Sequence, residues 1–209
     1  MAPLSVMRAA PESIDSTFEF LYAIRRGFMK SQIKRADGSE RILGFHMPGD
    51  LIGMDGTPSG KHGCDAIALE NTSVCQISYL DLEELASVMP NLEQLLERII
   101  RREVVRLYGN MLAFNEMGPG ERLALFLVTL STRYVARGYS QTRFKLHMPH
   151  QDIANHLGLT LETLSRQFSR LEDTQVIALQ DGWVEIKDPD RLEKIIESYI
   201  ARRDPRQSA

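Results

Sequence analysis

A short stretch near residue 160 carries acidic, hydroxyl and basic side chains in a spacing suited to reading DNA. Ser165 and Arg166 follow Glu162 by three and four residues, so all three lie on one side if the stretch is helical. Arginine donates a bidentate pair of hydrogen bonds to guanine, glutamate accepts one from the cytosine amine, and serine can do either. The same side continues to Ser169 and Arg170. The set predicts a surface that contacts base edges and phosphates.

The neighbouring residues predict the helix that carries this surface. Apolar residues recur on its opposite side at intervals of three, four and three, at Leu161, Leu164, Phe168 and Leu171. Thr160 is a good N-cap, and Gly158 permits the left-handed backbone of a sharp turn after a first helix over residues 149–157. Helix, glycine turn and helix form the pattern of a helix-turn-helix. The candidate DNA-binding residues are Glu162, Ser165, Arg166, Thr160, Thr163, Ser169 and Arg170.

A simpler interpretation of this helix is an ordinary surface helix. Glu162 and Arg166 are then an exposed ion pair one helical turn apart. The flanking elements favour DNA binding instead. The first helix and its glycine turn come directly before, and strands over 176–179 and 183–186 follow around Gln180-Asp181-Gly182, where a wing would lie.

The N-terminal half has the pattern of short strands. Residues 28–34 and Glu40–His46 flank Ala36-Asp37-Gly38-Ser39, and Asp-Gly is a strong hairpin signal. Met47-Pro48-Gly49-Asp50 predicts a second turn, and residues 74–79 a further strand. The small and polar residues 1–17 are expected to be poorly ordered. Strands followed by helices indicate an α+β fold.

A long helix is expected between the two halves, from Asn91 to Glu116. Apolar residues recur along it at intervals of four, three, four and three, which is a heptad seam. The seam residues are Ile100, Val104, Leu107, Met111 and Phe114. The seam predicts a homodimer, and the alternative is a core helix that packs on its own chain. Four arginines, Arg98, Arg101, Arg102 and Arg106, are expected to be solvated.

Composition argues against several other classes of protein. The net charge is −3, and no apolar run approaches the roughly 20 residues that cross a bilayer. The N-terminus is a poor signal peptide, so a cytoplasmic location without membrane contact is expected. A glycine-rich phosphate loop, a nucleophile elbow and an HExxH motif are all missing from the sequence, so we do not expect an enzyme.

Two other clusters of polar residues are candidate sites. His147, His150 and His156 lack a cysteine or a suitably spaced carboxylate to complete a metal site, so no metal is expected. Cys64 and Cys75 form a candidate redox pair, but two separate thiols are the simpler interpretation.

The sequence resembles the CRP/FNR family of bacterial transcription regulators from about Leu21 to Glu185. The stretches that carry the resemblance are LYAIRRGFMKS at 21–31, GFHMPGDLIGMD at 44–55 and DIANHLGLTLETLSR at 152–166. The resemblance implies a β-roll or jelly-roll sensor domain resembling a cyclic-nucleotide-binding domain over 18–89. It further implies a dimerisation helix over 90–117 and a winged helix-turn-helix over 118–201.

The resemblance is strongest to the FNR branch of the family. It implies that Glu162, Ser165 and Arg166 read palindromic TTGAT-like sites in double-stranded DNA. It also implies a contact between RNA polymerase and the hairpin from Lys34 to Glu40. The alternative is a redox- or ligand-sensing module that acts by protein contact and has lost useful DNA binding.

The sensor half departs from the family at two features. Members that bind cyclic nucleotides hold the phosphate with an Arg-Ser or Arg-Thr pair, and here His62-Gly63-Cys64 stands in the corresponding place. Iron–sulfur members carry a cysteine cluster near the N-terminus and one more cysteine in the β-roll, which Cys75 matches. By the resemblance, this sequence begins inside the family's β-roll and therefore lacks the N-terminal cluster. We expect either that the first strands of the roll are missing or that the native start lies upstream of Met1. A cubane cluster is normally held by four cysteines. We therefore expect no cofactor, and an iron–sulfur cluster only if the native protein has further cysteines upstream.

Overall fold

The computed structural model describes residues 4–7, 14–57 and 59–203. The chain divides into two compact units, Met1–Arg106 and Leu107–Ala209, which are described separately. The division falls within one helix, α2 (Pro90–Glu116), which contributes residues to both units. Within the described residues, no helix is long and apolar enough to span a membrane.

The first unit contains two antiparallel sheets that share one core. One sheet has the order β1-β7-β2-β5, and the other has the order β4-β3-β6. Buried side chains of both sheets meet in this core, among them Ile24, Met29, Ala66 and Val74. The strands are β1 (Leu4–Met7), β2 (Phe20–Arg26), β3 (Met29–Lys34), β4 (Glu40–His46), β5 (Leu51–Ile52), β6 (Asp65–Ala68) and β7 (Thr72–Ser78).

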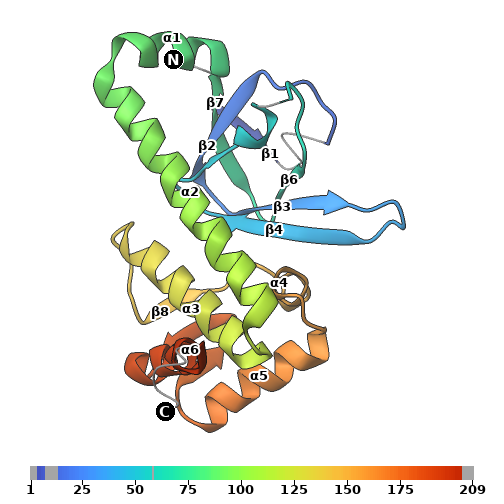
Figure 1. Cartoon of the computed structure of the whole chain (residues 1–209), viewed down its shortest axis with the longest axis vertical. Helices are drawn as coiled ribbons and strands as arrows, with labels where there is room; N and C mark the ends of the chain where they lie inside the picture. Colours follow the sequence, from blue (N-terminus) through green and yellow to red (C-terminus); the bar gives the residue numbers. More distant parts are fainter. Residues whose placement is uncertain (1–3, 8–13, 58, 204–209) are drawn as a thin grey trace. The chain divides into compact units, whose positions relative to one another are not determined.

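Both predicted turns of this unit are confirmed. The hairpin of β3 and β4 extends away from the other strands of the unit (Figure 1) and closes where the Arg35 N–H donates to the Ser39 carbonyl, at 2.8 Å. Gly38 takes a φ of 80° there, a conformation that favours glycine. In the second turn the Met47 N–H donates to the Asp50 carboxylate at 2.8 Å.

The prediction that residues 1–17 are poorly ordered is wrong at two places. Leu4–Met7 form β1, which pairs with β7 over four residues. Thr17 forms a bridge with Lys61. The physical reason is that β7 offers a second edge, opposite to β2, and backbone hydrogen bonds to that edge do not depend on a hydrophobic pattern in the added strand. Residues 1–3 and 8–13 lie outside the described residues.

Two helices follow the strands. Ser78 ends β7 and caps α1 (Tyr79–Val88) by accepting a hydrogen bond from the Asp81 N–H at 3.3 Å. The second helix, α2, begins at Pro90 and runs for 27 residues, which is about 40 Å at ~1.5 Å per residue. The predicted long helix is thus confirmed, whereas α1 was not anticipated.

One of the four arginines expected to be solvated on α2 is packed instead. The Arg106 side chain is 21% exposed and pairs with Glu103. It also donates to the Phe45 carbonyl at 3.4 Å. A Cβ added to Gly44 would lie 3.3 Å from its guanidinium, so the glycine gives Arg106 its room. The prediction that Arg106 is solvated was wrong, because its contacts with Gly44 and Phe45 join residues that are far apart in the sequence.

The second unit is a helical layer with a small sheet. Its helices after α2 are α3 (Pro119–Val135), α4 (His150–Leu157), α5 (Leu161–Asp173) and α6 (Pro189–Arg203). Strands β8 (Arg143–Lys145), β9 (Ile177–Gln180) and β10 (Trp183–Ile186) form a sheet in the order β8-β10-β9. The core beneath them includes Leu123, Leu127, Ile153 and Leu192.

Candidate nucleic-acid interface

The turn between α4 and α5 sets the angle of the two helices. Gly158 takes the left-handed conformation, with a φ of 66° and a ψ of 37°. This conformation lets the Leu159 N–H donate back to the Ala154 carbonyl at 2.8 Å, which satisfies a carbonyl at the end of α4. The second helix then starts at the predicted cap, where the Thr160 hydroxyl accepts from the Thr163 N–H at 3.1 Å. The helix-turn-helix expected from the sequence is formed.

The two sides of α5 differ sharply in burial. Leu164 and Phe168 are 0% and 2% exposed, and Leu171 is buried beside them. The opposite side, with Glu162, Ser165, Arg166, Ser169 and Arg170, is exposed. Leu161, at the first position of α5, was assigned to the apolar stripe but is 42% exposed. The buried apolar residues of α5 therefore anchor the helix with its polar side facing solvent.

The polar side chains of α5 interact weakly with one another. The Arg166 guanidinium lies 3.9 Å from the Glu162 carboxylate and donates to the Thr163 hydroxyl at 3.2 Å. Both charged side chains are mostly exposed. Exposed pairs of this kind contribute about 0–1 kcal/mol to stability, so they can be exchanged for a partner's groups at small cost.

A two-stranded wing follows α5, as predicted. β9 and β10 are joined through Asp181 and Gly182, both with positive φ, as a tight hairpin turn requires. Trp183 at the start of β10 is part-exposed, and the Arg143 guanidinium lies 5.4 Å from its ring centroid. Exposed cationic and aromatic groups therefore lie on this small sheet as well as on α5.

Arg122 on α3 is a supporting residue that the sequence analysis missed. Its guanidinium donates to three backbone carbonyls, at 2.9–3.0 Å, belonging to Phe114, Met117 and Leu157. Carbonyls in the last turn of a helix lack partners within the helix, so one arginine here serves the ends of both α2 and α4. The Leu157 carbonyl is 35 residues from Arg122 in the sequence, and a lone arginine gives no signal of such a role.

Two of the three candidate histidines, His150 and His156, pack against different aromatic rings. The His150 ring stacks on Phe168, with centroids 5.0 Å apart. The His156 ring is buried and lies 6.0 Å from Phe126 and 6.5 Å from Phe114. In the described part of the chain, no group of three or more histidine, cysteine, aspartate or glutamate side chains is arranged for a metal ion. The aromatic contacts give His150 and His156 a packing role.

The two cysteines do not form a disulfide and differ in setting. Cys75 lies on β7, and Cys64 is in the loop before β6, where its thiol donates to Asp55 at 3.4 Å. A four-iron cluster normally takes four thiolates. The cysteines of this chain do not fit such a cluster.

The seam residues of α2 lie mostly on an open surface. Leu107 and Met111 are 50% and 59% exposed, and Ile100 and Val104 are exposed to a similar degree. Phe114 differs from them, because its half-buried ring lies against His156 and 5.8 Å from the Arg122 guanidinium of the same chain. Four of the five seam residues thus remain available to a partner.

Comparison with known proteins agrees with this architecture. Residues 14–88 match the family model of the cyclic nucleotide-binding domain, and residues 121–195 match the Crp-like helix-turn-helix domain. The chain is 38% identical over 183 residues to the transcriptional regulatory protein btr of Bordetella pertussis, covering 88% of this chain and 76% of that protein. The chain belongs to the CRP/FNR family of transcription regulators.

Two further matches support this membership. The fumarate and nitrate reduction regulatory protein of Escherichia coli is 39% identical over 175 residues, covering 84% of this chain and 70% of that protein. The structure of FixK2 from Bradyrhizobium japonicum superposes with a TM-score of 0.83 at 27% identity, covering 93% of this chain and 97% of that one. Members of the CRP/FNR family are regulators, so this chain is a transcription regulator with a helix-turn-helix domain and not an enzyme.

Proposed function

We propose that this regulator binds palindromic, TTGAT-like sites in double-stranded DNA as a homodimer. The observation that carries the proposal is the exposed polar side of α5, supported by buried Leu164 and Phe168 on the other side. A helix held in this way is suited to enter the major groove. Glu162, Ser165 and Arg166 are the proposed base-reading residues, and Thr160, Thr163, Ser169 and Arg170 are proposed to add phosphate and neighbouring contacts.

The proposed dimer rests on the apolar side of α2. Ile100, Val104, Leu107 and Met111 keep heptad spacing and remain exposed. An exposed ion pair at 2.8 Å joins Glu97 and Arg101 at the N-terminal end of the stripe. An exposed apolar stripe with heptad spacing is typical of a two-stranded coiled coil, and a two-fold dimer supplies the two reading helices that a palindrome requires.

A binding assay with matched DNA duplexes tests the proposal. One duplex carries two TTGAT-like half-sites whose centres are about 10 base pairs apart, or one helical turn. The others carry one half-site, two half-sites five base pairs further apart, and scrambled sequence. The proposal expects tight, saturable binding only to the first duplex, with two chains per duplex by light scattering. Equal affinity for the four duplexes would reject it by showing non-specific binding, and no binding to any of them would favour a regulator that acts through protein contact alone.

The β3–β4 hairpin is the proposed contact with RNA polymerase. The residues from Lys34 to Glu40 are all exposed. Hydrogen bonds from Ser39 hold the pKa of Asp37 below its ordinary value, so this carboxylate stays charged at the tip. A Lys34→Glu variant is expected to reduce transcription from a purified promoter while DNA affinity stays unchanged.

A further inference from the structure

One carboxylate in the first unit occupies an anion-binding arrangement of backbone groups. Asp55 lies in a short 3₁₀ turn, Met54–Gly56, and its Oδ2 atom accepts from the N–H groups of Gly63 and Cys64 at 2.7 and 3.1 Å. The Cys64 thiol donates to the same oxygen at 3.4 Å. Successive backbone N–H groups that converge on one point form a nest for an anion. Here the anion belongs to the chain itself.

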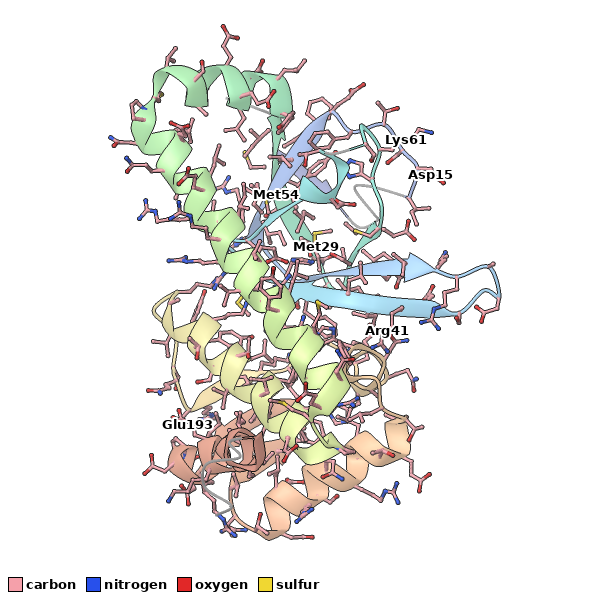
Figure 2. All side chains as sticks on the ribbon, in the orientation of Figure 1. Asp15, Met29, Arg41, Met54, Lys61 and Glu193 are labelled. Atoms are coloured by element: carbon pink, nitrogen blue, oxygen red, sulfur yellow. The ribbon has the colours of Figure 1, made fainter. Side chains whose placement is uncertain are left out.

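By its resemblance to cyclic-nucleotide-binding members of the family, the sequence places Gly63 and Cys64, which supply the N–H groups of the nest, where those members hold a ligand's phosphate. Residues 14–88 match the cyclic nucleotide-binding domain, and His62-Gly63-Cys64 replaces the Arg-Ser or Arg-Thr pair. In Figure 2 the labels Met54 and Lys61 mark the two segments that Asp55 joins, because each labelled residue directly precedes Asp55 or His62 in the sequence. Asp55 thus ties the 3₁₀ turn to the loop before β6, as a bridging phosphate would.

The charges of this region also disfavour a phosphate. From Ile42 to Glu97 the sequence carries nine carboxylates and no arginine, and its only lysine is Lys61. Lys61 is exposed, so this region lacks the buried cationic group that would strengthen phosphate binding by a charge-assisted hydrogen bond. A phosphate that entered the nest would meet the Asp55 carboxylate at hydrogen-bond distance, and two like charges so close repel strongly.

Phe18 packs against residues on both sides of the nest, His62 and Gly56. The His62 ring is 3% exposed and lies 5.5 Å from the ring of Phe18, with its Nδ1 atom 3.5 Å from the Asp55 carboxylate. Phe18 also packs so tightly on Gly56 that an added Cβ would come within 2.6 Å of its ring. The residues before and after the nest are therefore held in place without a ligand.

We propose that the Asp55 carboxylate occupies the position of a ligand's phosphate in this domain. Because the nest is already filled by a side chain of the same chain, the domain binds no cyclic nucleotide. The residues present do not fit that ligand, although the fold matches the family that binds it. Removal of the carboxylate, with the N–H groups left in place, opens the nest to an external anion.

The test uses the full chain, with Asp55→Ala and Asp55→Asn variants. Alanine empties the nest, whereas asparagine fills it with a neutral acceptor of the same shape. Asp37→Ala is the matched control, because Asp37 is another carboxylate of this unit that accepts from a backbone N–H, at 2.8 Å, but in an open hairpin turn. Cyclic AMP and cyclic GMP are titrated by calorimetry into the unaltered chain, and thermal midpoints are compared in phosphate and chloride buffers of equal ionic strength.

The proposal expects no heat of binding from either cyclic nucleotide. It expects phosphate to raise the midpoint of Asp55→Ala by several degrees more than that of the unaltered chain, Asp55→Asn or Asp37→Ala. Saturable binding of a cyclic nucleotide to the unaltered chain overturns it. So does a phosphate effect on Asp55→Ala no larger than the effect on the controls. If Asp55→Ala does not fold, the proposal is tested by the cyclic-nucleotide titration of the unaltered chain. Neither the titration nor the thermal midpoint depends on DNA binding, so the proposed function can fail without affecting this test.

Discussion

Helices α2 and α5 are both amphipathic, but they use their apolar sides in opposite ways. On α5, Leu164, Phe168 and Leu171 are buried within the helix's own unit, and the polar side is exposed. The apolar residues on the seam of α2, such as Leu107 and Met111, are half or more exposed. An apolar side that is already covered leaves the polar side free for a polar partner. An apolar side that is uncovered indicates a partner that will cover it.

The largest effect on stability is expected from shortening a buried side chain of α5. Leu164→Ala removes a fully buried side chain and leaves a cavity, so we expect a loss of about 2–5 kcal/mol in the free energy of unfolding. Urea unfolding measures this loss, which should not depend on protein concentration. Leu107→Ala is the matched change on α2, and its effect should grow as the protein is concentrated through the dimerisation range. The same concentration dependence for both variants would contradict the contrast between the helices.

A charge on the seam is expected to separate the subunits. Leu107→Asp would bring two carboxylates together across the two-fold axis, and burial of unpaired charges is strongly unfavourable. We expect monomers by light scattering and a loss of at least about 100-fold in affinity for a palindrome, because the linked second half-site is lost. Val105→Asp is the control, since Val105 is 71% exposed and lies off the seam on the same helix. Equal losses from the two variants would show that the seam has no special role.

A smaller and more selective effect is expected on the polar side of α5. Arg166→Ala should cost about 1–3 kcal/mol in binding to the specific site, as for a bidentate base contact, with little change on random DNA. Fluorescence anisotropy on both duplexes measures the difference. Lys194→Ala, which removes an exposed cation of α6, should leave both affinities nearly unchanged. Equal losses on specific and random DNA would reduce Arg166 to a phosphate contact.

The smallest effect is expected at the exposed end of the apolar stripe of α5. Leu161→Ser replaces a residue that is already 42% exposed, so the free energy of unfolding should change by about 0.5 kcal/mol or less. Urea unfolding beside Leu164→Ala checks it. A loss as large as that of Leu164→Ala would mean that the whole stripe is covered in solution.

Features with local causes were predictable from the sequence. The hairpin at Asp37-Gly38, the turn at Gly158 and the cap at Thr160 each depend on a few neighbouring residues, and all three are confirmed. The face of α5 followed from helical spacing alone. Its role in reading bases stays a prediction until DNA binding is measured.

Features that depend on distant residues were missed. Helix α1 follows β7 without a glycine or proline between them, so no sequence break marks its start, and none of its residues is buried. Arg106, Arg122 and Asp55 all find their partners through the fold. A heptad pattern also does not show which seam residues are exposed and which pack within their own chain. Phe114 is on the seam, but its ring lies against His156 of the same chain.

The uninterrupted course of α2 sets a rule for anyone who builds hybrid regulators from this chain. Because the boundary at Arg106 and Leu107 falls inside a helix, a sensor from one relative can be joined to a reader from another only within that helix. One extra residue at the junction turns everything after it by about 100° around the helix axis, since a turn takes 3.6 residues. Seven extra residues restore the phase to within roughly 20°. Working chimaeras should therefore recur at junction lengths that differ by whole heptads.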